Sequence, residues 1–435
     1  MPHALVQEAV KTMDAATGNA ARDGAVGAPH APQEDLDVNR VVAIARDLLA
    51  RRFGGTPDLG DVELLGGSGN ATVVRARLSS SAFLPHRSVV VKHMPVTGHA
   101  IDDSAFMREV VAYQFTTSLP EDVRPGPVLL AYDMDQRIVV LTDIGDADTL
   151  VDRLRTADDA ERIKIVRLLG EQLGLMHAGT AGREQDYEVL LARMLHKHPD
   201  YREKQAKRDD ALQRSILMGL DLLRDAGLEP PAEFTELATH ATEIQQSGHS
   251  RAFTPFDLSP DNIVVGDKIY FLDYEWAGFR NVGFDVACVI AGFPQFLFSR
   301  PISNEEADVF VGAWAREIAE TWPRYADEGK LHRLLVSSLI GWALSSVTML
   351  YADSLEGILA LARGEDILHT ENRESILRSP DEGHFSEDEL LVRQDLFETF
   401  EALGRFAAQC ETDECLAVSV FAQTVAARLL PPSTY

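Results

Sequence analysis

The sequence contains little cysteine and no excess of basic residues. Three cysteines in 435 residues, Cys288, Cys410 and Cys415, are too few for a disulfide framework and favour a reducing cytoplasm. No histidine lies near Cys410 and Cys415 along the sequence, so a zinc cluster is not expected there. The 41 Lys and Arg residues face 68 Asp and Glu residues, a net charge of −27. Because a phosphate backbone selects basic surfaces, this charge argues against nonspecific nucleic-acid binding and mildly favours a cationic or neutral partner.

Long uninterrupted apolar segments are also missing. The longest apolar region, 334–351, is broken by hydroxyl residues and a glycine. A core helix explains it better than a membrane span, which needs roughly 20 predominantly apolar residues. The first residues show no basic segment followed by an apolar stretch, so we expect no secretory signal. A cytoplasmic protein that binds neither membrane nor nucleic acid is the simplest interpretation.

The pattern of apolar residues divides the chain into two halves of different type. Residues 1–36, rich in Ala, Gly and Pro, are expected to form a flexible tail, and an apolar stripe then predicts a helix over 38–53. Five short Val- and Leu-rich runs between 61 and 143 predict a mostly antiparallel sheet, with a helix over 103–119 after the third strand. Beyond 150 the pattern is mainly helical. We therefore expect an α+β chain with a small sheet lobe, 37–143, and a larger helical lobe, 144–435.

The stretch "FTPFDLSPDNIVVGDKIYFLDYEW", residues 253–276, combines acidic side chains with two short strand-like runs. Gly266-Asp267 suits a two-residue hairpin turn. If Val265 pairs with Lys268, then Asn262 lies opposite Phe271, and Asp273 shares their face of the hairpin. One divalent ion could then touch both Asn262 and Asp273, whose oxygens are the hard ligands that Mg²⁺ accepts.

Asp257 precedes Asn262 by five residues, in the loop that enters this hairpin. A carboxylate at this place could accept a hydroxyl proton beside the metal. An Asp-Leu-x-x-x-Asn spacing, followed by a second metal-binding Asp after a hairpin, is typical of kinases. The alternative is a polar turn in which Asn and Asp side chains bond to nearby backbone groups.

The sheet half carries further signals of phosphate binding. Gly66, Gly67 and Gly69 lie between two predicted strands, where backbone N–H groups can approach phosphates, although such glycines also occur in ordinary hairpins. Lys92 ends a run of valines in the third strand, and Glu109 lies in the helix that follows. Pairing of the two residues next to phosphates is the kinase arrangement, and an edge-strand Lys facing water is the alternative. The order of these signals along the chain favours a kinase.

Over residues 38–300 the sequence resembles the aminoglycoside phosphotransferase and choline kinase superfamily. The likeness is carried by "PFDLSPDN", "LDYEWAGFRNVGFDVA", "LTDIGD" and "LGLMHAG". This resemblance implies a bilobal, protein-kinase-like fold. It also implies transfer of the γ-phosphoryl group of ATP, or of GTP, to a hydroxyl of a small molecule. An antibiotic of the aminoglycoside type or another hydroxylated natural product is the first expectation. A sugar, an amino alcohol or a nucleoside-like compound is the alternative.

The resemblance also implies residue roles. Asp257 would be the catalytic base or would orient the hydroxyl, while Asn262 and Asp273 would bind Mg²⁺. Lys92 would hold the α- and β-phosphates and be positioned by Glu109. The backbone of Leu141 to Asp143 would meet the adenine.

One departure from the family pattern concerns the catalytic loop. The family has His-Gly before the catalytic Asp, whereas this chain has Pro255-Phe256, so the usual loop hydrogen bond from the His is absent. Asp285 is expected to buttress this loop, or else to cap the helix that starts at Val286. A nucleotide-binding pseudokinase that binds a partner is the second class of function that the sequence leaves open.

Overall fold

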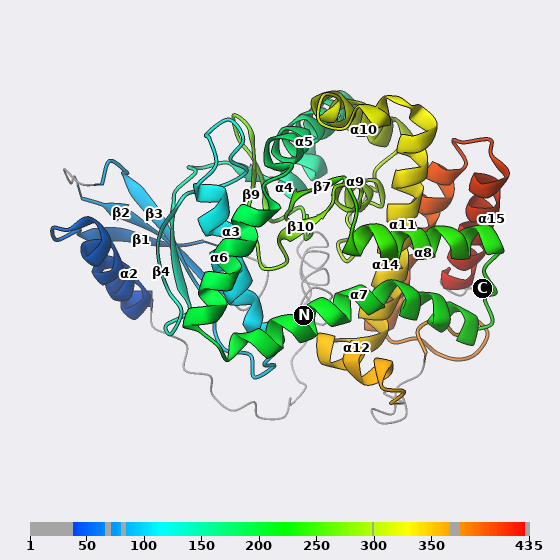
Figure 1. The fold of residues 1–435 in the computed structure, drawn as a ribbon, viewed down its shortest axis with the longest axis horizontal. Helices are drawn as coiled ribbons and strands as arrows, with labels where there is room; N and C mark the ends of the chain where they lie inside the picture. Colours follow the sequence, from blue (N-terminus) through cyan, green and yellow to red (C-terminus); the bar gives the residue numbers. More distant parts are fainter. Residues whose placement is uncertain (1–37, 66–70, 80–83, 298–299, 366–374, 431–435) are drawn as a thin grey trace, which may run out of the picture. The chain divides into compact units, whose positions relative to one another are not determined.

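The computed structural model describes residues 38–65, 71–79, 84–297, 300–365 and 375–430, so the expected tail lies outside the described residues. The chain divides into two compact units (Figure 1). One contains the described residues up to Pro95 together with Val128–Gly145, and the other contains Val96–Pro127 and everything from Asp146 onward. The segment around the predicted helix 103–119 thus belongs to the helical unit, whereas we expected it in the sheet lobe. The assignment of nucleotide and substrate functions to separate lobes stays a prediction.

The first unit is built on a five-stranded sheet with one helix against it, which confirms the predicted antiparallel sheet. The strand order is β1-β2-β3-β5-β4, and every neighbouring pair is antiparallel. The elements are α2 (Val38–Phe53), β1 (Leu59–Leu65), β2 (Thr72–Leu78), β3 (Ser88–His93), β4 (Leu129–Asp133) and β5 (Ile138–Thr142). Val41, Ala45 and Leu49 of α2 form one buried cluster with Val89 and Val91 of β3. Helix α2 therefore covers one face of the sheet.

The second unit is mainly helical, as predicted. Its helices are η1 (Asp102–Ser104), α3 (Ala105–Thr117), α4 (Leu150–Thr156), α5 (Asp159–Thr180), α6 (Glu184–Lys197), α7 (Tyr201–Asp225), α8 (Ala232–Gln246), α9 (Gly283–Ile290), α10 (Asn304–Ile318), η2 (Pro323–Ala326), α11 (Glu328–Ala352), α12 (Leu355–Ala362), α14 (Glu387–Ala407) and α15 (Asp413–Leu429). Its short strands are β6 (Asp148–Thr149), β7 (Arg251–Thr254), β8 (Ile263–Val265), β9 (Ile269–Phe271) and β10 (Gly278–Asn281). They form two small sheets, β6-β8-β9 and β10-β7.

Helix α11 contains the longest apolar region of the sequence. Among the described residues it is the one helix long and apolar enough to cross a membrane, but 83% of its most apolar window is buried inside the protein. It packs against α7, α8, α9 and α14 (Figure 1). The residues 334–351 therefore form a core helix of the second unit, as the interrupting hydroxyl residues predicted.

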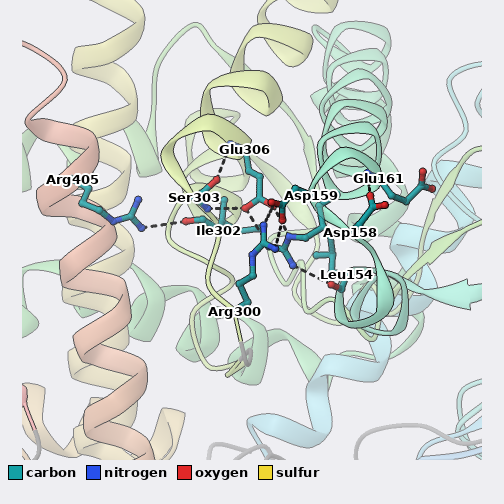
Figure 2. A network of polar contacts seen from close by, with 10 residues as sticks. Leu154, Asp158, Asp159, Glu161, Arg300, Ile302, Ser303, Glu306 and Arg405 are labelled. Atoms are coloured by element: carbon teal, nitrogen blue, oxygen red, sulfur yellow. Dashed lines mark hydrogen bonds and ion pairs between the residues drawn. The ribbon is translucent and has the colours of Figure 1, made fainter.

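Helices α5 and α10 pack closely and are joined by a buried ion pair. A Cβ at Gly170 would lie 2.4 Å from the Phe310 carbonyl oxygen, so only glycine permits this approach of the two helices. Arg162 of α5 donates two hydrogen bonds to the Glu306 carboxylate of α10, and each side chain is only 2% exposed. Figure 2 shows Glu306 at the centre of this network, where its carboxylate also accepts from the backbone N–H of Ser303 at 2.8 Å. The pair fixes the start of α10 against α5.

A second buried carboxylate, Asp395 of α14, makes stability depend on pH. Burial, followed by the charge of Glu398, raises the pKa of Asp395 to about 7, against the hydrogen bond that its carboxylate accepts from the Gln295 N–H. Among the described residues, the other carboxylate oxygen has no hydrogen-bond partner. Because the folded-state pKa is raised, the stability contributed by the protonated form is complete below about pH 4 and is lost as the pH rises through about 7.

We therefore expect Asp395→Asn to stabilise the protein, and to do so more at pH 8 than at pH 5.5. Asn keeps an acceptor for Gln295 but never ionises, so the gain should grow between these pH values by about 1–2 kcal/mol. Thermal-unfolding midpoints at both pH values measure this. Asp388→Asn, which removes an exposed carboxylate from the same helix, is the control. Equal effects of Asp395→Asn at both pH values would contradict the assignment.

Candidate active site

The hairpin in the stretch 253–276 forms with a different register from the one predicted. Val265 pairs with Ile269 and Ile263 with Phe271, and the Gly266 N–H donates to the Lys268 carbonyl at 3.0 Å. The turn therefore has three residues rather than two. The prediction that Asn262 lies opposite Phe271 is wrong, because Leu272 donates to the Asn262 carbonyl and takes that place. The predicted shared strand face of Asn262 and Asp273 therefore rests on a register that does not form, and their joint binding of a metal ion stays a prediction.

Asp273 lies beyond the end of β9, where the backbone leaves the strand conformation. Its φ is 57°, in the left-handed region, so alternation along the strand no longer sets the direction of its side chain. Its N–H donates to the Tyr113 hydroxyl of α3 at 3.4 Å, and Tyr113 packs on Tyr274 with ring centroids 4.7 Å apart. A Cβ at Gly126 would lie 2.3 Å from the Phe271 carbonyl oxygen, which makes glycine necessary beside this segment. Helix α3 and Gly126 thus position Asp273.

Asp257 follows a tight turn centred on Phe256. The Asp257 N–H donates to the Pro255 carbonyl at 2.8 Å across Phe256, whose φ is 68°. This is a γ-turn of the rare, strained type, and backbone strain of this kind concentrates at functional sites. The Asp257 carboxylate then accepts from the Ser259 N–H at 3.0 Å. The loop therefore holds Asp257 in one orientation without the histidine of the family pattern.

Aromatic contacts hold Phe256, which stands where the family pattern has glycine. Its ring stacks on Trp342 of α11, with centroids 4.9 Å apart and planes 24° from parallel. On the same ring lies the Arg280 guanidinium, 4.4 Å from the centroid. Burial, followed by the neighbouring Arg108, lowers the pKa of Arg280 to about 10, which leaves it charged at neutral pH. Cation–π and stacking contacts of this kind stabilise the turn that precedes Asp257.

The negative charges of two acids that follow β9, Glu275 and Asp273, act on Asp257. Burial raises the pKa of Asp257 to about 7, and the negative charges of Glu275 and then Asp273 add to the shift. A divalent cation offsets the repulsion between neighbouring carboxylates. The side-chain oxygens at this place are hard donors. The residues therefore fit Mg²⁺, with Asn262 and Asp273 as predicted ligands. That ligand set stays a prediction.

The remaining acids of the stretch differ in their surroundings. Asp267 is exposed at the hairpin turn and accepts from the Tyr270 hydroxyl at 3.0 Å. Asp261 accepts from the Ser259 hydroxyl within the loop. Glu275 is 8% exposed and affects the pKa of Asp257 more strongly than Asp273 does. Glu275 is not among the site residues that we predicted from the sequence, although its Asp-x-Glu spacing from Asp273 was a usable signal.

Asp285 is part of a buried hydrogen-bonded chain rather than a helix cap. Helix α9 begins at Gly283, so the predicted capping of a helix from Val286 is wrong. The Trp314 indole N–H donates to Nδ1 of His177 at 3.0 Å, which leaves the proton of His177 on Nε2, 3.2 Å from Asp285. His177 comes from "LGLMHAG" at the end of α5, where Thr180 accepts from the N–H of Phe253 in β7. Helix α5 thus contacts, through Thr180, the strand that leads into the loop of Asp257.

The predicted nucleotide residues of the first unit are partly described. Lys92 is 8% exposed on the central strand β3, so the edge-strand alternative is wrong. Val89 and Val91 of β3 lie on the sheet face that α2 covers. Because side chains alternate between the two faces along a strand, Lys92 lies on the face opposite α2. Glu109 is fully buried in α3, in the other compact unit, and its pairing with Lys92 stays a prediction. Gly66, Gly67 and Gly69 lie outside the described residues.

Leu141 and Asp143 mark the end of β5 in the same unit. Leu141 is 5% exposed and pairs with Val90 of β3. The Asp143 carboxylate accepts from the Ser88 hydroxyl at 2.6 Å and forms an ion pair with Arg75 at 2.9 Å. Burial raises the pKa of Asp143, but these hydrogen bonds and that of the Gly145 N–H lower it overall. The side chain of Asp143 is structural, and contact of this backbone with adenine stays a prediction.

Solved structures similar to this chain are kinases of small molecules. A choline/ethanolamine kinase family protein from Mesorhizobium loti shares 14% identity over 88% of this chain and 99% of its own, with a TM-score of 0.42. Choline kinase LicA from Streptococcus pneumoniae shares 14% over 84% and 99%, with a TM-score of 0.41. An ADP-bound aminoglycoside phosphotransferase shares 12% over 76% and 98%, with a TM-score of 0.39. No protein-family model and no curated protein matches the sequence. The similar structures are of the two kinds that the sequence motifs resemble.

Proposed function

We propose that this protein transfers the γ-phosphoryl group of ATP or GTP to a hydroxyl of a small molecule. The observation that carries the proposal is the state of Asp257. Its half-buried carboxylate accepts from the Ser259 N–H at 3.0 Å directly after the strained turn at Phe256, and the charges of Glu275 and Asp273 act on it. A carboxylate held in one orientation in this way can accept a proton from an attacking hydroxyl.

The other residues take the roles that their positions allow. Asn262 and Asp273 would hold Mg²⁺, which when bound neutralises charge on the transferring phosphoryl group. Lys92 would contact the α- and β-phosphates from the sheet face opposite α2. Asp257 orients the acceptor hydroxyl and takes up its proton. Little covalent work falls to the protein, so alignment and charge neutralisation supply the rate enhancement.

We propose that the acceptor is a cationic or neutral hydroxylated molecule and that the reaction takes place in the cytoplasm. The net charge of −27 and the acids around Asp257 disfavour an anionic acceptor. An aminoglycoside-type or other natural-product antibiotic and a metabolic amino alcohol, sugar or nucleoside-like compound both satisfy this description. Choline kinases and aminoglycoside phosphotransferases among the similar structures are consistent with either acceptor.

The proposal is tested by incubating the full chain with Mg-ATP or Mg-GTP and a panel of hydroxylated antibiotics and metabolites. We expect nucleotide diphosphate release to depend on one acceptor class, whose mass then increases by one phosphoryl group. Asp257→Asn should slow product formation by about a hundredfold or more, and Asp267→Asn, at the exposed hairpin turn, should not. Nucleotide binding without product from any acceptor would instead identify a nucleotide-binding partner module.

A further inference from the structure

Three potential metal ligands converge in the helical unit, away from the acids of the candidate active site. Cys410 lies in the turn between α14 and α15, Cys415 in the first turn of α15, and His332 near the start of α11. Their ligand atoms all lie within 4.8 Å of one another. The expectation that no histidine accompanies the two cysteines is wrong, because the fold brings His332 to them from a distant part of the sequence. Packing of α14 on both α11 and α15 brings the three together (Figure 1).

The imidazole of His332 is oriented with a nitrogen lone pair toward the sulfur atoms. Its Nε2 lies 3.0 Å from the Phe406 carbonyl oxygen, and because a carbonyl only accepts, Nε2 carries the proton. Nδ1 is then the unprotonated nitrogen, 3.8 Å from the Cys415 sulfur. The ring also stacks on Phe406, with centroids 4.8 Å apart and planes 9° from parallel. Metal-binding histidines characteristically donate their second N–H to a carbonyl or carboxylate in this way.

The two cysteines are held by the same residue of the turn. Thr412 caps α15, where its hydroxyl accepts from the Cys415 N–H at 3.3 Å. The same hydroxyl lies 3.5 Å from the Cys410 sulfur. Cys415 is therefore in the first turn of a 17-residue helix. Cys410 is partly exposed and gives access from solvent.

We propose that His332, Cys410 and Cys415 bind a divalent transition-metal ion, with zinc as the expected ion. Two thiolates and an imidazole are a zinc donor set, and tetrahedral zinc would separate a bound sulfur and nitrogen by about 3.5 Å. The observed 3.8 Å between Cys415 and His332 is close to this value, so binding needs little rearrangement. Glu414 is already paired with Arg333 at 3.1 Å, and water from the exposed side completes the coordination. The ion would fasten the α14–α15 turn to α11.

The test uses the untagged full chain, freed of metal under reducing conditions and then titrated with Zn²⁺ or Co²⁺. We expect about one equivalent of zinc to remain after gel filtration. Co²⁺ should produce thiolate charge-transfer absorption and the visible bands of tetrahedral cobalt. Zinc should also raise the thermal-unfolding midpoint. Cys410→Ser, at a partly exposed position that folding tolerates, should weaken zinc binding tenfold or more and remove the charge-transfer contribution of one thiolate.

Two further variants separate a built site from weak surface binding. His332→Asn should weaken zinc binding to the same degree, whereas Cys288→Ala, at the cysteine outside the cluster, should retain it. Absence of retained zinc in the wild type, or cobalt spectra unchanged in Cys410→Ser, would overturn the proposal. A thiol count could also overturn the proposal. It would do so if Cys410 and Cys415 form a disulfide in air and added zinc does not prevent this. The two cysteines would then be a redox pair. These readouts are independent of phosphotransfer.

Discussion

Asp257→Asn should lower kcat by about 10²- to 10⁴-fold, the usual range for loss of a positioned acid or base. Asn has nearly the same shape and keeps an oxygen for the Ser259 N–H, so the strained loop should remain in place. What it loses is the ability to accept a proton from the acceptor hydroxyl. Because Asp257 acts on the acceptor rather than on the nucleotide, affinity for Mg-ATP should change far less than turnover. The two quantities therefore separate a catalytic role from a binding role.

Steady-state kinetics with the acceptor identified in the panel, together with calorimetric titration of the nucleotide, measure the two effects. Asp267→Asn is the matched control, since it removes a carboxylate from the same stretch but from an exposed turn. Undiminished kcat in Asp257→Asn would refute the assignment. Equal losses of turnover and of nucleotide affinity would show that the residue supports the nucleotide site instead.

The sheet half of the fold was predictable because its signals are local. Short β-branched runs separated by turn residues predict strands, whose backbone N–H and C=O groups need a neighbouring strand as partner. Each predicted strand was found in an antiparallel ladder. The hairpin register was not predictable to one residue. A Gly-Asp pair is compatible with several turn lengths, and the three-residue turn that forms shifts Asn262 out of line with Phe271.

Residues that act through long-range packing escaped sequence reasoning. Phe256 was noticed only as a departure from the family pattern, because its partner Trp342 lies on a helix far along the chain. The cluster of His332 with the two cysteines was missed for the same reason, because His332 lies far from them in the sequence. The Asp-x-Glu spacing pointed to Glu275, but its burial and its effect on the pKa of Asp257 could be seen only in the structure. Spacing along one strand or loop predicts chemistry well, whereas clusters assembled from several helices need the packing itself.

Glu306→Ala should lower the free energy of unfolding by about 3–5 kcal/mol, as when one partner is removed from a buried ion pair. Arg162 would then be left 2% exposed, with the Leu154 carbonyl at 3.1 Å as its remaining acceptor among the described residues. Its charge would lie at the α5–α10 interface, where the approach of the two helices leaves little room for water. The loss is measured by guanidinium unfolding followed by circular dichroism.

Two controls separate this effect from the other contacts of Glu306. Ser303→Ala removes the helix cap but leaves the ion pair, and should cost about 1 kcal/mol. Arg300→Ala removes the exposed partner that Glu306 contacts at 3.4 Å, and little change is expected (Figure 2). A loss for Glu306→Ala no larger than for Ser303→Ala would mean that capping, not charge pairing, is the contribution of Glu306.

The double variant Arg162→Met/Glu306→Leu shows whether the cost comes from the charge left behind. If it does, removing both charges should restore much of the stability lost in Glu306→Ala, because apolar side chains of similar length can fill the same space without a desolvation penalty. The part not restored should approximate the Ser303→Ala loss, since Leu cannot accept from the Ser303 N–H. A double variant no more stable than Glu306→Ala would show instead that the hydrogen-bonded pair itself, through its geometry, determines how α10 begins against α5.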